Sequence, residues 1–223
     1  MQSKINFTYT GIIISINFLV FLILLVLGFD PYNCGLNICK DVALSPVLVL
    51  AGENLWTFIT SMFSHFGLGH LAMNMISLMF IGGLVERLIG KKRFLWFYLV
   101  AGLFAGVLYV LLAGIFGTSE IGARLFGSPT TFAVGASGAI FGLGGLLAVL
   151  VPRMRVLVFF IIPMSMWAAM TFFIVVLWAV SFGTGLPIGN SAHFGGLIVG
   201  IIYGFYLKQK YPKKVEILRR RLI

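Results

Sequence analysis

Charged residues are scarce in this sequence. Asp, Glu, Lys and Arg make up 10% of its 223 residues, whereas a soluble domain carries roughly 25%. The mean hydropathy is +1.07, and several apolar stretches each approach the ~20 residues that cross a bilayer. This scarcity excludes a separate soluble domain of useful size and predicts an all-α, polytopic membrane protein.

Internal repeats are also absent, so the sequence lacks the inverted-repeat signature of many transporters. Cysteines are few: Cys34 and Cys39 both fall in the first loop expected on the outer side of the membrane. A disulfide between them would persist if that face is oxidising. Their spacing alone leaves the pairing open.

The apolar stretches predict a single domain with six membrane spans. We place the spans at residues 9–29, 67–86, 94–116, 136–151, 155–181 and 188–207, with a basic cytoplasmic tail over 208–223. From Ser137 to Val151 the fourth span has 15 residues. That length gives roughly 22 Å of helix, against a hydrocarbon core ~30 Å thick. Its start is therefore recessed below the outer surface, and outer loop 3 (117–135) must re-enter the membrane.

The net charge of +10 suggests nucleic acid as a partner, but the placement of the basic residues argues against it. Of the 16 basic residues, 14 fall on alternate loops, and only Lys40 and Arg124 fall on the other side. Under the positive-inside rule both termini are cytoplasmic. We therefore expect an integral cell-membrane protein that contacts lipid and binds no nucleic acid.

Polar residues from three expected spans fall at one depth near the outer surface. His70 and Asn74, four residues apart, share a face of span 2. Ser137 lies at the start of span 4, and His193 lies at a similar depth on span 6. Each of these residues taken singly has a structural explanation, such as a serine bonded to its own backbone. Their coincidence indicates a function, because ionisable groups inside spans are rare.

Small residues suggest how two of these groups meet. They recur at four-residue steps beside the serine on span 4 (Gly138, Gly142) and beside the histidine on span 6 (Ala192, Gly196, Gly200, Gly204). Such stripes let helix backbones approach closely. A hydroxyl and an imidazole in hydrogen-bonding reach have the geometry of a nucleophile with its general base.

Acidic residues are absent from this layer. All six lie outside the spans or at their cytoplasmic ends, so the arrangement would be a Ser–His dyad of Ser137 and His193. Three groups are candidates for stabilising an oxyanion: Asn74, His70 and the backbone N–H of Ser137. We expect no metal and no cofactor.

Four motifs together resemble the rhomboid family of intramembrane serine proteases, over residues 10 to 207. They are "HFGLGHLAMN" with His65, His70 and Asn74, "GGLVERLIG" with Glu86, "GASG" with Ser137, and "AHFGGLIVG" with His193. Two positions depart from the family pattern. Thr57 follows Trp56 where the family often has arginine, and Phe141 stands one turn after the serine where tyrosine is common.

The resemblance implies hydrolysis of a peptide bond near the outer end of a substrate's transmembrane helix, by the Ser137–His193 dyad. It implies transmembrane proteins as substrates, with His65, Phe141, Gly138, Gly196 and Gly200 in supporting roles. Span 5 and the glycine-rich loop before span 6 would be the moving parts. Two alternatives remain open: an ion transporter that uses the histidines as ligands, and a catalytically inactive relative that binds membrane proteins.

Overall fold

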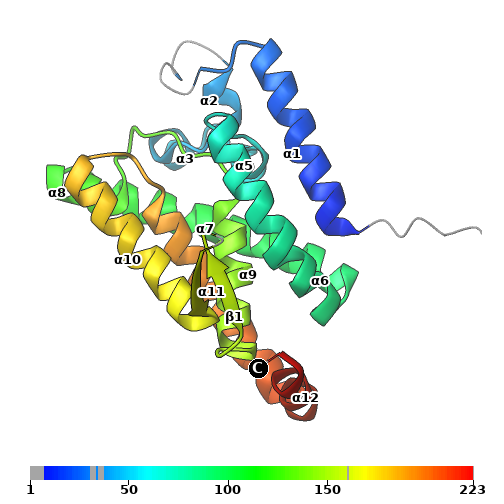
Figure 1. The fold of residues 1–223 in the computed structure, drawn as a ribbon. Coiled ribbons are helices and arrows are strands. Elements are labelled where there is room, and N and C mark those ends of the chain that lie inside the picture. The colour runs from blue at the N-terminus through cyan, green and yellow to red at the C-terminus, as the bar shows by residue number, and fades with distance from the viewer. Residues whose placement is uncertain (1–7, 31–33, 35–37, 160, 223) are drawn as a thin grey trace, which may run out of the picture.

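The computed structural model describes residues 8–30, 34, 38–159 and 161–222, and most of them are helical (Figure 1). The helices are α1 (Tyr9–Val26), α2 (Cys39–Val42), α3 (Pro46–Leu50), α4 (Thr57–Thr60), α5 (Leu68–Ser77), α6 (Gly83–Ile89), α7 (Lys91–Phe116), α8 (Glu120–Phe126), α9 (Ser137–Leu150), α10 (Met166–Thr184), α11 (Asn190–Lys210) and α12 (Pro212–Leu222). A 3₁₀ turn, η2 (Ser61–Phe63), follows α4. A π-helical turn, η3 (Leu78–Gly82), joins α5 to α6.

Within the described residues, four helices are long and apolar enough to cross a membrane. They are α1, the continuous α5–α6 helix over Leu68–Ile89, α7 and α10. The fourth expected span corresponds to a shorter apolar helix, α9, with 14 residues. The chain is therefore a helical membrane protein, as predicted, and the count of six spans stays a prediction.

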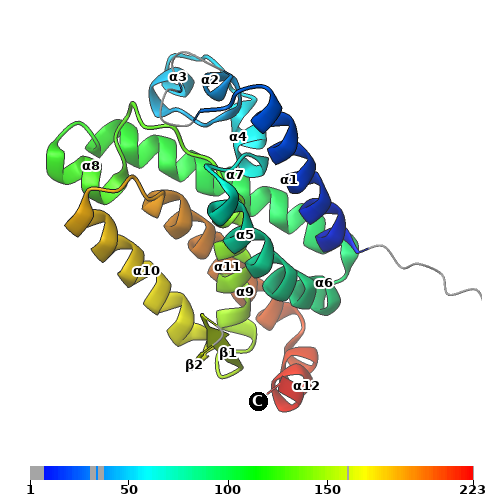
Figure 2. The same cartoon turned by 45° about the horizontal axis from the view of Figure 1, so that its top comes forward.

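The centre of the bundle is α9, with eleven of its fourteen residues buried. Helix α11 packs along it, α7 lies against both, and α10 and α5–α6 lie on either side (Figures 1 and 2). A helix that is apolar on every face is stable only when it is surrounded. Since α9 begins at Ser137, this central position places the serine inside the protein.

The first helix is fixed to the bundle by a buried carboxylate. Glu86 of α6 accepts hydrogen bonds from the N–H groups of Tyr9 and Thr10, both 2.8 Å long, and from the Thr10 hydroxyl at 2.6 Å. The first N–H groups of a helix have no partner within the helix and carry partial positive charge. Glu86 therefore satisfies the start of α1 from a different helix.

The loop between α1 and α5 is tied to the segment that leads to Ser137. The N–H of Leu44 donates to the carbonyl of Ala133 at 2.9 Å, and the reciprocal bond is 2.8 Å long. The loop itself is held by a disulfide between Cys34 and Cys39. The indole of Trp56 donates to the carbonyl of Asp41 at 2.7 Å, so this tryptophan anchors the loop without a following arginine.

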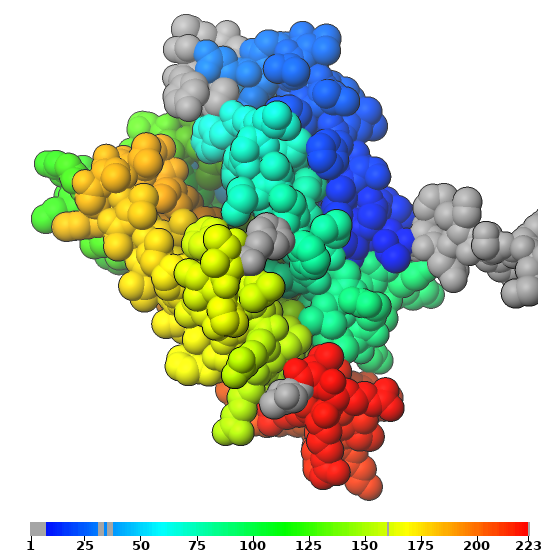
Figure 3. Space-filling model, in the orientation of Figure 1, coloured from blue at the N-terminus to red at the C-terminus, as the bar shows by residue number. Residues whose placement is uncertain are grey.

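One part contradicts the sequence prediction, and two further helices were not predicted. The fifth span does not start at residue 155, because strands β1 (Arg155–Val158) and β2 (Ile162–Ser165) form an antiparallel hairpin before α10. The loop between α7 and α9, residues 117–135, contains the short helix α8. The basic tail is helical over α12, which projects from the bundle (Figure 3).

Candidate active site

The candidate nucleophile lies where an extended segment turns into α9. Gly135 has φ +125°, a conformation that L side chains rarely adopt, and its N–H donates to the carbonyl of Ser61 at 2.8 Å. Ser137 is the first helical residue. The N–H groups of a first helical turn have no intrahelical acceptor, so the backbone N–H of Ser137 is available to a ligand.

The structure brings Ser137 and His193 into direct contact. The distance between Ser137 Oγ and His193 Nε2 is 2.8 Å, which is a hydrogen bond. The two helices approach closely enough because a Cβ at Gly196 would collide with the carbonyl of Gly138, and one at Gly200 with the carbonyl of Gly142. Backbone therefore packs on backbone along this interface, as the small-residue stripes predict.

The imidazole of His193 is held by an aromatic ring. Phe141, one turn after Ser137, stacks on it with 4.5 Å between ring centroids and 20° between planes. None of the described residues hydrogen-bonds to His193 Nδ1. The ring is thus oriented by stacking and by the serine, without a carboxylate.

His70 presents its Nε2 edge to the same place. Its Nδ1 accepts a long hydrogen bond, 3.4 Å, from the N–H of Phe66. In a neutral imidazole the other nitrogen then carries the proton. A Cβ built on Gly135 would lie 3.0 Å from His70 Nε2 and 3.6 Å from Ser137 Oγ, so the donor and the hydroxyl flank one small space.

Asn74 lies one turn after His70 and is buried. Its amide nitrogen donates one hydrogen bond to the carbonyl of His70, 2.8 Å long. An amide carries two N–H groups, so the second remains for another acceptor. Ser137, His193, His70 and Asn74 all line one cavity.

His65 does not line that cavity. It is 1% exposed, and its ring makes an edge contact with the ring of His70, with 5.1 Å between the ring centroids. Burial, aided by the proximity of His70, lowers the pKa of His65 to about 3, so the ring is neutral near pH 7. This histidine packs against His70 and does not face the serine.

The cavity has a volume of about 1150 Å³ and runs from the Ser137 end towards the basic side of the bundle, where Arg87 and Arg155 line it. One wall comes from α5, η3 and α6, and the other from α10 and the hairpin. In the space-filling view these two walls face each other across one side of the molecule (Figure 3). Its lining is mostly apolar, which suits a ligand drawn from lipid.

Tyr109 also lines this cavity and was not predicted from the sequence. It is 1% exposed, and its hydroxyl donates to the carbonyl of Thr131 at 2.8 Å. This bond fixes the segment that leads to Gly135. The available signal was a tyrosine within an apolar span, since a buried phenol usually finds a hydrogen-bond partner.

The fold and the geometry define an integral membrane protein of helical type, whose central helix presents a serine hydrogen-bonded to a histidine. A family model described as "Rhomboid domain" matches residues 52–210. The match covers most of the chain, including Ser137, His193, His70 and Asn74. The chain belongs to the Rhomboid family.

Three relatives illustrate the similarity. RHOMBOID-like protein 5 of Arabidopsis thaliana is 36% identical over 166 residues, which is 74% of this chain and 48% of the relative. The Rhomboid protease GluP of Bacillus subtilis is 33% identical over 195 residues, 86% of this chain and 33% of the relative. The mitochondrial Rhomboid protein 1 of Saccharomyces cerevisiae is 32% identical over 165 residues, which is 71% of this chain and 43% of the relative. The chain thus spans a third to a half of these relatives.

Proposed function

We propose that this chain is an intramembrane serine endopeptidase. The observation that carries the proposal is the 2.8 Å hydrogen bond between Ser137 Oγ and His193 Nε2 inside a cavity within the bundle. A serine hydroxyl is a weak nucleophile until an adjacent base takes its proton. The family membership and the printed name of the Bacillus subtilis relative, a rhomboid protease, support the same activity.

In the proposed reaction Ser137 Oγ attacks the scissile carbonyl carbon while His193 Nε2 accepts the hydroxyl proton. The imidazolium then gives that proton to the leaving amine, and the C–N bond breaks to leave an acyl-enzyme. A water molecule, deprotonated by His193, then attacks the ester carbonyl, and the imidazolium returns the proton to Ser137 Oγ as the C–O bond breaks and the acid product leaves. Phe141 keeps the imidazole in place by stacking, in the absence of a carboxylate among the described neighbours of Nδ1.

The negative charge on the tetrahedral intermediate would be stabilised by three donors. They are the backbone N–H of Ser137, Nε2–H of His70 and the second N–H of the Asn74 amide. Preorganised donors in a site shielded from water are worth more than donors in bulk solvent. The position of His70 Nε2 beside Gly135 and Ser137 supports this assignment.

The proposed substrates are transmembrane proteins, cut near the outer end of a membrane helix. A large, mostly apolar cavity between α5–α6 and α10 suits an apolar segment. The scissile bond must leave its helix before Ser137 can reach the carbonyl, so substrates with helix-weakening residues are expected. The charge distribution supports a cytoplasmic position for both termini and for the basic side of the bundle.

The geometry gives less support to an ion transporter. Among the described residues no three His, Cys, Asp or Glu side chains are grouped as a metal site. An inactive binding relative would lack a competent nucleophile, and a chemical probe separates that case from an enzyme.

Two measurements test the proposal. We expect a fluorophosphonate probe to label Ser137 covalently in the wild type and to fail in both Ser137→Ala and His193→Ala. In reconstituted vesicles, the wild type but not Ser137→Ala should cleave a single-span substrate. Wild-type protein that neither reacts with the probe nor cleaves any membrane substrate would leave the binding relative as the better description. Ion flux without labelling would favour the transporter.

A further inference from the structure

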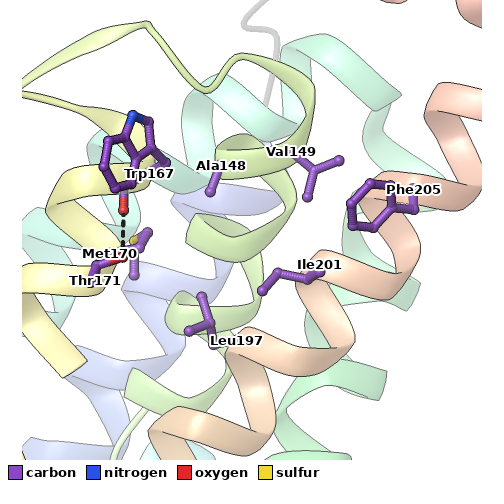
Figure 4. Close-up of a pocket in the computed structure, with 8 residues that line it drawn as sticks. All are labelled: Ala148, Val149, Trp167, Met170, Thr171, Leu197, Ile201 and Phe205. Carbon is purple, nitrogen blue, oxygen red and sulfur yellow. Dashed lines mark hydrogen bonds between the residues drawn. The ribbon is translucent and has the colours of Figure 1, made fainter. Parts of the chain in front are cut away.

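A second, smaller groove lies on the outside of the bundle, away from the serine. It has a volume of about 280 Å³ and is formed where α10 and α11 diverge over α9. Figure 4 shows Trp167 and Thr171 of α10 on one side, Ile201 and Phe205 of α11 on the other, and Ala148 of α9 between them. Because the Ala148 side chain is small, it fills little of the space between α10 and α11.

The groove is apolar and open to the surroundings. Trp167 is 55% exposed and Phe205 is 49% exposed, and the Thr171 hydroxyl is engaged by the carbonyl of Trp167 at 3.1 Å. Because α10 is long and apolar enough to cross a membrane and α11 is predicted to do so, we expect the groove to face lipid, where water is a poor occupant. Its walls are about as apolar as the lipid itself, so shape alone gives little affinity.

Cations gather at the basic end of the groove. Lys208 Nζ lies 5.9 Å from the ring centroid of Phe205. Arg219 of α12 donates to the carbonyl of Val149, a groove residue, at 2.9 Å. Exposed Arg153 follows Pro152, whose carbonyl accepts the N–H of Trp167 at 3.4 Å. An apolar slot with cations at one end complements a molecule with an acyl chain and an anionic headgroup.

We infer that this groove is a binding site for one anionic phospholipid of the inner leaflet. One acyl chain lies over Ala148 between α10 and α11, and the phosphate lies near Lys208. Aromatic residues such as Trp167 favour the level of the headgroups, which agrees with this orientation. The groove has about a quarter of the volume of the active-site cavity, too little for a substrate helix.

The site adjoins the active-site cavity through one side chain. Met170 of α10 lines both spaces, and it also covers Gly144 of α9. A lipid chain in the groove would therefore brace α10 on the side opposite the cavity. The inference does not depend on the proposed proteolysis, because it concerns lipid binding alone.

Native mass spectrometry of the purified 223-residue chain tests the site, with phosphatidylglycerol and phosphatidylcholine as probes. The wild type should retain one phosphatidylglycerol in preference to phosphatidylcholine. Lys208→Gln should weaken that binding about five-fold, since a cation near the headgroups contributes about 1 kcal/mol. Thr171→Trp should abolish it by filling the groove from an exposed position.

Matched variants identify the location. Val175→Trp adds the same ring one turn along α10, outside the groove, and Lys92→Gln removes a charge from the same side of the bundle on α7. Both should bind phosphatidylglycerol like the wild type. Equal retention of the two lipids, or loss in the control variants as large as in Lys208→Gln and Thr171→Trp, would overturn the inference. So would a dimer that Thr171→Trp dissociates, since a second copy would then occupy the groove.

Discussion

Gly196 of α11 lies directly against the carbonyl of Gly138 on α9, with no room for a side chain between them. This contact is one turn from the hydrogen bond between Ser137 and His193. The distance between hydroxyl and imidazole is therefore set by how closely two backbones pack. The geometry of Ser137 and His193 therefore depends on how α11 packs against α9.

Gly196→Val tests that coupling. The added side chain must push α11 from α9, and a displacement of ~1 Å at reacting groups costs about 100-fold in rate. We expect cleavage of a single-span substrate to fall by that factor. Gly183→Val on α10 is the matched control, because a Cβ there meets nothing within 4 Å. Equal activity of the two variants would show that the close approach is unnecessary.

The oxyanion assignment predicts a specific loss in Asn74→Ala. Removing one donor to a developing oxyanion lowers kcat by roughly 10²–10³. Because the Asn74 amide also bonds the carbonyl of His70, the thermal midpoint of unfolding should be measured on the same sample. A fall in kcat at an unchanged midpoint supports the assignment, and unchanged turnover would remove Asn74 from the site.

The link between α6 and α1 predicts a defect in stability. Glu86→Gln keeps one acceptor oxygen but loses the charge that receives three hydrogen bonds. A hydrogen bond to a neutral acceptor is weaker than one to a charged acceptor by about 1 kcal/mol, so we expect a loss of about 1–3 kcal/mol in the free energy of unfolding. Scanning calorimetry in detergent measures it, with Glu53→Gln in the exposed outer loop as control. Similar midpoints for both variants would contradict the role of Glu86.

The membrane spans, and the shared depth of the polar residues in them, could be predicted from the sequence. Both follow from properties that add up or repeat along the chain. Hydropathy summed over ~20 residues locates spans, and position along a span gives depth. Ser137 and His193 were expected to meet because small residues flank both. The structure places them as expected, 2.8 Å apart.

The hairpin over residues 155–165 could not be predicted in the same way. The run from Val156 to Ile162 is apolar, and hydropathy does not distinguish a strand from a helix in a short apolar run. Pro163 was the available signal, because proline disfavours a helix interior, and α10 begins three residues later. The hydrogen bonds from Arg219 to the carbonyls of Val149 and Leu150 could not be predicted either, because they join parts of the chain that are far apart in sequence.

Phe141 supplies the last prediction, because it replaces the tyrosine common in the family. The structure shows the ring stacked on His193, so a hydroxyl is not needed for that contact. Aromatic pairs contribute about 0.5–1.5 kcal/mol beyond area burial. Phe141→Ala should therefore lower kcat about 2- to 10-fold by releasing the imidazole, whereas Phe141→Tyr should retain the wild-type rate.

Single-turnover cleavage of a vesicle-embedded substrate measures both variants of Phe141. Folding must be checked separately, since loss of a buried ring also leaves a void in α9. If Phe141→Ala unfolds at the same temperature as Phe141→Tyr yet cleaves more slowly, the ring acts by orienting His193. If both variants cleave at the wild-type rate, the hydrogen bond to Ser137 alone is enough to position the imidazole.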